Sequence, residues 1–293
     1  MPLHTILVPL DGSPVGEAAL PYAEALARKC GASLRLVRAA RPAERQPAEA
    51  YLQALRARGA SDSLNAEVEV PTGSPPEAIR AEIAAARADL VVMATHNRTG
   101  PRRWAEGSVA ESVVSQGNAP VLLVRANQSP ERAERLDQAR PLLVVPLDGS
   151  AFAETALAFA SELASAIGGA LVLVRIGQGS GRLAAEGDAY LGAFEAGMDT
   201  ATPGLGRDVQ VVVGEARAYL GAVATRLAKS LVADTQVRLG DVVGEIVQEA
   251  EDRNAAAIVM TTHGRTGVAR TMFGSVAGRI VHEGNFPVIL IRN

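Results

Sequence analysis

The chain has 293 residues, a length that accommodates two domains of ordinary size. Its 29 basic and 32 acidic side chains give a net charge of −3, so charge does not favour nucleic acid or an anionic membrane as a partner. Hydrophobic residues make up 48% of the sequence and aromatic ones 3%, which excludes a disordered chain and predicts aliphatic cores.

The first 125 residues predict an alternation of strands and helices. Short apolar runs indicate strands, and apolar positions three and four residues apart indicate helices. The predicted strands cover residues 6–9, 33–37, 66–70, 90–94 and 121–124. The predicted helices cover residues 16–31, 48–58, 76–86 and 108–115.

The sequence then repeats itself. TILVPLDGS at 5–13 returns as LLVVPLDGS at 142–150, an offset of 137 residues. LVVMATHNRTG at 90–100 returns as IVMTTHGRTG at 258–267, and the offset between His96 and His263 is 167. The repeats predict two homologous domains, at residues 1–137 and 138–293.

The second unit is about 30 residues longer than the first, because the offset grows from 137 to 167. The extra residues enter a Gly-rich stretch, about 177–214, after the second strand of that unit. We expect helical pieces at 184–198 and a strand at 209–213 within it. The stretch is interpreted either as a lid beside a ligand site or as a surface excursion.

Five strands alternating with four helices predict an α/β fold in each unit. We expect two tandem, doubly wound, mostly parallel five-stranded sheets with helices on both faces. Their fifth strands, at 121–124 and 288–291, are apolar edges that pairing would protect. The two units are expected to pack as a pseudo-twofold dimer within the chain, and a further homodimer is left open.

Ligands of such sheets bind beyond the carboxyl ends of the strands, so polar residues there are the candidates. Asp11 and Asp148 follow the first strand of each unit and could bind a ribose hydroxyl, an amine or a hydrated metal ion. Alternatively, Asp-Gly-Ser forms a turn and caps the next helix. Gly274 and Ser275 open a helix whose backbone N–H groups could attract phosphate.

Signatures of an enzyme are absent from the sequence. It has neither a P-loop, nor a complete G-x-G-x-x-G after a strand, nor a G-x-S-x-G motif. The four histidines lack metal-ligand spacing, and the single cysteine excludes a cysteine-based metal site. Nor does the sequence contain a signal peptide or an apolar run of eighteen residues, so we expect a cytoplasmic protein without membrane contact.

The whole pattern resembles a tandem universal stress protein. The resemblance rests on VPLDGS in each unit, VMATHNRTG and VMTTHGRTG, GSVAESVV and GSVAGRIV, and the closing APVLLVR and FPVILIR. It covers nearly all of the chain except the linker and the Gly-rich stretch. It implies the fold of the adenine nucleotide alpha hydrolase-like proteins and a site for ATP, with or without Mg²⁺.

Members of that family that bind ATP carry G-x-x-G, nine residues and then G-[ST]. The second unit keeps the spacing with Thr261, Gly264, Gly274 and Ser275. The first unit keeps it with the residues Ala94, Asn97, Gly107 and Ser108. Both units lack the first glycine and only the second unit has the other, so the second unit is predicted to be the better site.

The resemblance also implies roles for other strand-end residues. It places Asp11 and Asp148 at the adenosine end, and Asp148 beside the Mg²⁺ of Mg-ATP. The remaining contacts that it implies are made by backbone groups, at adenine by Ala39 and Ile176 and at phosphate by Val109 and Val276.

Three functions are consistent with these residues. The first is a nucleotide-binding regulatory or stress-response protein. The second is a stress scaffold or binding protein with vestigial sites, which the missing glycines favour. The third is a slow ATPase, for which no general base with a nucleophile or metal cluster is visible.

Overall fold

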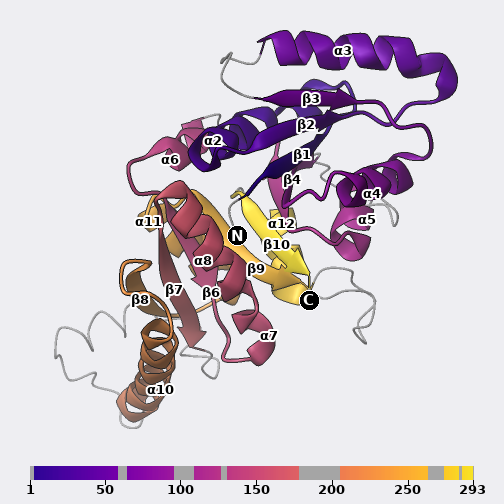
Figure 1. The fold of residues 1–293 in the computed structure, drawn as a ribbon. Coiled ribbons are helices and arrows are strands. Elements are labelled where there is room, and N and C mark those ends of the chain that lie inside the picture. Colours follow the sequence, from indigo (N-terminus) through magenta and orange to yellow (C-terminus); the bar gives the residue numbers. More distant parts are fainter. Residues whose placement is uncertain are drawn as a thin grey trace.

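The computed structural model describes residues 3–58, 65–95, 109–126, 131–177, 205–262, 274–283 and 286–292. Strands and helices alternate along the chain, and the strands form the centre of the molecule (Figure 1). The predicted residues 184–198 of the Gly-rich stretch lie outside the described residues.

The first half follows the predicted alternation closely. Its elements are β1 (Thr5–Pro9), α1 (Pro14–Glu17), α2 (Leu20–Cys30), β2 (Ser33–Val37), the 3₁₀ helix η1 (Pro42–Glu44), α3 (Arg45–Arg58), β3 (Ala66–Glu69), α4 (Pro75–Ala85), β4 (Leu90–Thr95), α5 (Val109–Gln116) and β5 (Val121–Arg125).

A short linker helix, α6 (Glu131–Asp137), leads into the second half. The described elements of that half are β6 (Leu142–Pro146), α7 (Ala151–Glu154), α8 (Ala156–Ile167), β7 (Ala170–Gly177), α10 (Leu205–Thr225), β8 (Val232–Leu239), α11 (Val242–Asp252), β9 (Ala257–Thr262), α12 (Ser275–Glu283) and β10 (Val288–Arg292).

All the strands join one ten-stranded sheet in the order β3-β2-β1-β4-β5-β10-β9-β6-β7-β8. Neighbouring strands are parallel except β5 and β10, which pair antiparallel where the halves meet. The two apolar fifth strands thus protect each other's edges, as the sequence predicted. Two five-stranded halves therefore form one continuous sheet (Figure 1).

The register of this central pair is self-complementary. Leu122 pairs with Ile289, and these residues occupy the same position in the two repeats. On either side, Leu123 pairs with Val288 and Val121 pairs with Leu290. Equivalent residues of the two repeats therefore exchange places across this pair of strands.

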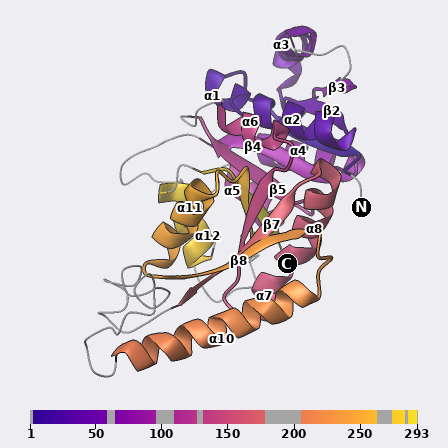
Figure 2. The ribbon, with the colours of Figure 1, turned by 90° about the vertical axis from the view of Figure 1, so that its left-hand side faces the viewer.

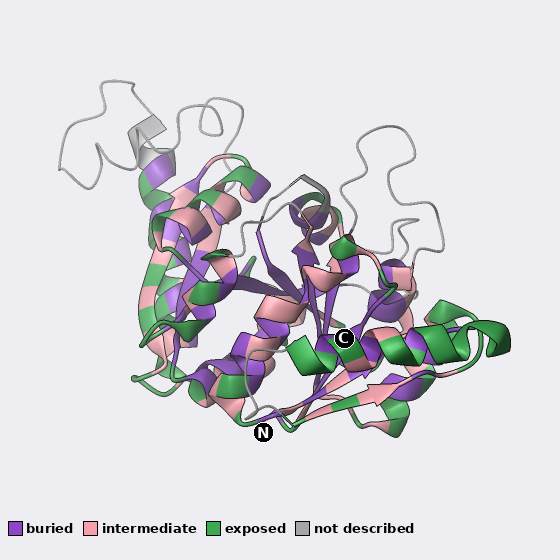
Figure 3. Ribbon diagram, turned by 90° about the horizontal axis from the view of Figure 1, so that it is seen from above, coloured by how far each residue is buried: buried purple, intermediate pink, exposed green. Residues whose placement is uncertain are grey.

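Helices cover both faces of the sheet, so its central strands are buried on both sides, whereas the edge strands β3 and β8 are only partly buried (Figure 3). Along β1, Ile6 and Val8 belong to one apolar cluster and Leu7 belongs to the other, as alternation in a strand requires. This explains why central strands such as β4 and β9 have almost entirely apolar sequences.

Two sequence predictions need correction. Residues 209–213 are not a strand but lie inside α10, the long helix that runs below the sheet in Figure 2. The predicted helix at 16–31 is divided into α1 and α2, just as the equivalent segment of the second half is divided into α7 and α8. The helix stop at Gly31 is confirmed, since this residue has a left-handed φ of 68°.

The linker helix α6 contacts both halves of the chain. It packs against α2, and its Arg132 donates a hydrogen bond to Glu251 of α11 at 2.5 Å. The same guanidinium lies 4.9 Å from the ring centre of Phe286, which precedes β10. No helix of the described residues is long and apolar enough to cross a membrane.

Candidate functional site at the carboxyl edge of the sheet

The chain order of the strands reverses between β1 and β4, and again between β6 and β9. From β6 the chain moves outward through β7 to β8, then returns to the other side of β6 as β9. The carboxyl ends of β6 and β9 are therefore neighbours, but the chain leaves β6 toward β7 on the opposite side from β9. The ends of β1 and β4 are arranged in the same way. Sheets of this kind bind ligands at such switch points.

The loop after the first strand of each half is a hydrogen-bonded turn. Asp11 Oδ1 accepts hydrogen bonds from the backbone N–H of Ser13 at 2.9 Å and from its hydroxyl at 2.6 Å. Ser13 Oγ in turn accepts from the Gly16 N–H at 3.1 Å and caps α1. The turn-and-cap interpretation of this motif is thereby confirmed.

The second half repeats this turn. Asp148 Oδ1 accepts from the Ser150 N–H at 2.8 Å, and Ser150 Oγ accepts from the Ala153 N–H at 3.1 Å. Both aspartates are exposed. Within the described part of the chain, the Oδ2 atom of neither Asp11 nor Asp148 accepts a hydrogen bond, which leaves one carboxylate oxygen for a ligand.

The ends of β4 and β9 lie beside these loops. Ala94 is half-buried, whereas the equivalent Thr261 is buried, with 8% of its surface exposed. The next residue, Thr262, has a buried hydroxyl oxygen without a hydrogen-bond partner among the described residues. Its equivalent, Thr95, bonds the carbonyl oxygen of Val124 at 3.4 Å. The orphaned hydroxyl therefore distinguishes the second half.

The described remainder of the glycine motif lies at a helix start. Ser275 is the first residue of α12, and the Gly274 carbonyl oxygen accepts from the Gly278 N–H at 2.8 Å. Val276 is half-buried on the first turn, and Val109 begins α5 in the equivalent position. The remaining motif residues lie outside the described ranges, and these are Asn97, Gly264, Gly107 and Ser108.

The residues predicted to contact adenine lie at the ends of β2 and β7, the strands next to β1 and β6. Ala39 follows β2 and Ile176 is near the end of β7, and both are half-buried. Because β6 is bonded to both β7 and β9, the ends of these strands place Asp148, Ile176 and Thr261 along one edge. The structure therefore groups the described candidates of each half at its switch point.

Sequence reasoning missed a side-chain network beside each turn. In the first half, the guanidinium carbon of Arg38 lies 5.0 Å from the ring centre of Tyr51. The Tyr51 hydroxyl donates to Glu17 Oε1 at 3.1 Å, and Arg58 donates to Glu17 Oε2 at 3.1 Å. The network therefore links the end of β2 to α3 and α1.

The second half contains the same network. Arg175 lies 4.7 Å from the ring centre of Tyr219. The Tyr219 hydroxyl donates to Glu154 Oε1 at 2.9 Å, and Arg226 donates to Glu154 Oε2 at 2.7 Å. Its partners on β7, α10 and α7 correspond to those of the first half.

These contacts shift the acidity of the groups involved. Burial and the hydrogen bond to Glu154 raise the pKa of Tyr219 to about 12. Hydrogen bonds from Arg226 and Tyr219 lower the pKa of the Glu154 carboxyl. Burial raises the pKa of Tyr51 in the same direction. The sequence repeats the arginine of LRLVR and LVLVR in the two halves, but that repeat does not identify the tyrosine or the glutamate of the network.

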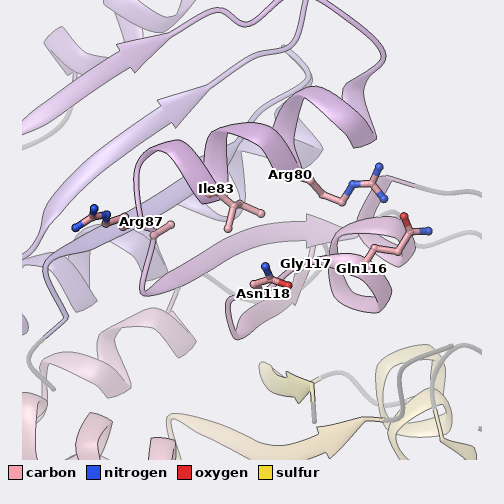
Figure 4. A pocket seen from close by; sticks show the side chains of 8 residues that line it. Arg80, Ile83, Arg87, Gln116, Gly117 and Asn118 are labelled. Carbon is pink, nitrogen blue, oxygen red and sulfur yellow. The ribbon is translucent and has the colours of Figure 1, made fainter. Parts of the chain in front are cut away.

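A separate pocket of about 300 Å³ lies between α4 and the loop before β5 (Figure 4). Its lining residues, Ile83, Arg87, Gly117 and Asn118 among them, precede β4 and β5 or belong to α4. The pocket is therefore at the amino edge of the sheet, opposite the switch points, and contains none of the predicted site residues.

Comparison with known proteins identifies the family. The family model described as "Universal stress protein family" matches residues 2–125 and 142–292. The chain belongs to the universal stress protein family. Two matched segments agree with the tandem repeat, while the exact boundary at residue 137 stays a prediction.

Universal stress proteins of both tandem and single-domain length are similar to this chain. The universal stress protein Rv2005c of Mycobacterium tuberculosis is 28% identical over 249 residues, covering 84% of this chain and 75% of that protein. A universal stress protein of Thermus aquaticus is 33% identical over 134 residues, covering 41% of this chain and 98% of that protein.

A solved universal stress protein structure from Archaeoglobus fulgidus has the same fold. It superposes with a TM-score of 0.69 at 17% identity, covering 99% of this chain and 96% of that one. At this identity the likeness supports the α/β architecture of this universal stress protein and no finer assignment.

Proposed function

We propose that the chain is a nucleotide-binding regulatory protein of the stress response, with an adenine nucleotide bound at the switch point of each half. The second half is the better site. The observation that carries the proposal is the reversal of strand order between β6 and β9, which brings the Asp148 turn and the strand leading to α12 to one point.

In this proposal each element of the site contacts one part of ATP. Asp148 binds the ribose through its free carboxylate oxygen, and the backbone of Ile176 meets adenine. Thr261 flanks the ribose, while backbone N–H groups of Gly264, Gly274 and Val276 and the hydroxyl of Ser275 bind phosphate. The equivalent residues of the weaker site are Asp11, Ala39, Ala94, Asn97, Gly107, Ser108 and Val109.

The described residues fit such a ligand. The N-terminus of α12 supplies backbone N–H groups that the helix itself does not use. The described part of the chain contains no group of three or more His, Cys, Asp or Glu side chains for a metal. When Mg²⁺ accompanies the nucleotide, the phosphates would hold it, and the free carboxylate oxygen of Asp148 would serve the ion as well as the ribose.

The proposal includes the arrangement of the two halves. The self-complementary register around Leu122 and Ile289 supports a pseudo-twofold axis through the β5–β10 pair. The two nucleotide sites would then be equivalent positions of a dimer contained in one chain. A further homodimer and a cytoplasmic location stay predictions.

Native mass spectrometry of freshly purified protein tests the proposal, followed by extraction of any released small molecule. We expect an adenine nucleotide at the second site, and loss of that nucleotide in Gly274→Leu, whose side chain would cover the N–H groups of α12. Gly221→Leu is the matched control, since Gly221 is exposed on α10 and a Cβ there meets no atom within 4 Å.

The alternative is a scaffold with vestigial sites. The replacement of the first motif glycine by Ala94 and by Thr261 favours this alternative. A protein that is purified empty and also ignores added ATP and Mg²⁺ would establish it. Weak ATP hydrolysis would be indicated only by turnover well above that of Gly274→Leu.

A further inference from the structure

We propose that Arg38 and Arg175 recognise a phosphate group carried on the ribose ring of the bound nucleotide, an inference that rests on the proposed function. Each guanidinium would bind a 2′- or 3′-phosphate beside the aspartate turn of its own half. The preferred ligand class is thus an adenosine bisphosphate with one phosphate at the 5′ position and one on the ribose.

Arg38 and Arg175 both lie against the aspartate turn of their own half. Gly12 has a φ of +88°, and a Cβ placed on it would lie 2.8 Å from a guanidinium nitrogen of Arg38. Gly12 follows Asp11, so the guanidinium lies directly against the turn that the proposed function places at the ribose. Arg175 lies against Gly149 in the second half, at 3.3 Å from the equivalent Cβ position.

The two guanidinium groups are fixed in position and retain N–H donors that could bind a ligand. Stacking on Tyr51 or Tyr219 fixes the plane of the guanidinium. Within the residues that the structure describes, neither Arg38 nor Arg175 donates a hydrogen bond. Arg38 and Arg175 are both half-buried, so water reaches their side chains only in part.

The glutamate carboxylate of each network already accepts hydrogen bonds from the tyrosine and from a second arginine. Glu17 accepts from Tyr51 and from Arg58, and it therefore holds the aromatic ring rather than Arg38. Glu154 does the same for Tyr219 in the second half. In the described part of the chain, these two glutamates thus pair with Arg58 and Arg226 and not with the stacked guanidinium groups.

The stacked tyrosine–arginine pair occurs in both halves of the chain. The helices α3 and α10 have diverged at an exposed position, where Glu49 corresponds to Arg217. The tyrosine and its arginine partner on the second strand are nevertheless present in both halves. The network has thus persisted where the surrounding surface has changed.

The chemistry of the two neighbouring side chains defines the ligand. In dinucleotide-binding sheets an acidic residue at this edge binds ribose hydroxyls, and a nearby arginine accommodates a ribose phosphate. A planar guanidinium matches two phosphate oxygens with two parallel N–H groups. Here an aspartate turn and a stacked arginine occur together, which favours a ribose with one hydroxyl and one phosphate.

Isothermal titration of the full chain tests this proposal with adenosine 3′,5′-bisphosphate, adenosine 2′,5′-bisphosphate and AMP. We expect one bisphosphate to bind about tenfold or more tightly than AMP, as one charge-assisted hydrogen bond would provide. In the variant with Arg38→Gln and Arg175→Gln the ratio of the two affinities should fall to about one. In the variant with Arg38→Lys and Arg175→Lys this ratio should also fall. Lysine keeps the positive charge but lacks the two parallel N–H groups of the guanidinium.

The matched control is Arg56→Gln with Arg217→Gln, which removes the same charge from exposed positions of α3 and α10. This control should retain the preference for the bisphosphate. Equal affinity of the unaltered chain for AMP and both bisphosphates would overturn the inference and leave the proposed function intact. A preference that survives in Arg38→Gln with Arg175→Gln would also overturn it. Absence of binding of all three compounds and of ATP would overturn both proposals.

Discussion

Arg238 of β8 donates a hydrogen bond to Glu249 of α11 over 2.8 Å, and the Glu249 side chain is only 4% exposed. Glu82 of α4 occupies the same repeat position in the first half, but its partner is Arg35 of β2. The two halves thus satisfy an equivalent buried carboxylate with arginines from different strands. Burial of that carboxylate requires a cation, and the repeat has kept the pairing without keeping the partner's position.

Removal of Arg35 is therefore expected to destabilise the protein strongly. Arg35→Ala leaves the Glu82 carboxylate, 11% exposed, without its guanidinium. We expect the free energy of unfolding to fall by about 3 kcal/mol, measured by urea unfolding. Adding Glu82→Leu should recover part of this loss, because the unpaired charge is then gone.

The control for this prediction is Arg41→Ala, which breaks an ion pair with Glu44 at an arginine side chain that is 81% exposed. That change should leave stability unaltered, since exposed pairs contribute little. An Arg35→Ala variant as stable as Arg41→Ala would contradict the importance of the buried pair.

The glycine of the aspartate turn should tolerate alanine poorly. Gly12→Ala would place a Cβ at a φ of +88° and 2.8 Å from the Arg38 guanidinium. Gly31 also has a left-handed φ, +68°, but no atom lies within 4 Å of its Cβ position. We expect Gly31→Ala to cost about 1 kcal/mol from backbone strain alone, and Gly12→Ala to cost about 2 kcal/mol.

Thermal unfolding of both variants measures this difference. Equal losses would mean that Arg38 moves aside freely and is not held against the turn. A loss confined to Gly12→Ala would instead indicate that the Gly31 helix end relaxes around its new side chain.

Local patterns predicted most of the fold, and tertiary context decided the rest. The strand at Ser33–Val37 was predicted with its exact bounds, because an apolar run between turns allows few other structures. The run VQVVV at 209–213 was misread because β-branched residues favour strands. Over a longer window the buried positions are Val209, Val213, Ala216, Leu220 and Val223, which have helical spacing.

The candidate site was predictable where it is local in sequence. The Asp-Gly-Ser turns and the Gly-Ser helix start are each read from a few adjacent residues. The Arg38–Tyr51–Glu17 network was not, because its members come from three separate segments and meet only when α3 places Tyr51 beside Arg38 at the end of β2. An isolated arginine at a strand end carries no signal of the ring on which it stacks.

Glu251 is expected to contribute to the attachment of the two halves. It accepts hydrogen bonds from Arg132 at 2.5 Å and Arg135 at 3.5 Å, and both arginine side chains are less than a fifth exposed. Glu251→Gln keeps the shape of the side chain and removes its charge. We expect a loss of about 1–2 kcal/mol in urea unfolding, reduced from the fully buried case because Glu251 is 34% exposed.

Glu134→Gln on the exposed side of α6 is the control for Glu251→Gln and should not change stability. High salt should weaken the unaltered protein more than Glu251→Gln, since the variant has less charge attraction to screen. The same salt response in both would contradict an electrostatic role for Glu251.

The two tyrosine networks are expected to make stability fall at high pH. Folding raises the pKa of Tyr219 from 10.0 to about 12, and Tyr51 shifts in the same direction. Between pH 10 and 12 the unfolded tyrosines have lost their protons while the folded ones retain them. The folded state then binds more protons than the unfolded one, so the free energy of unfolding decreases as pH rises.

Urea unfolding at pH 8 and at pH 11 measures this effect in the unaltered chain and in Tyr51→Phe with Tyr219→Phe. At pH 8 the variant should be the less stable protein, because it lacks two hydrogen bonds to glutamate. Its stability should then decline less between the two pH values, because phenylalanine cannot ionise. Parallel declines would show that other groups, such as the buried Tyr22, whose pKa burial also raises to about 12, govern the alkaline transition.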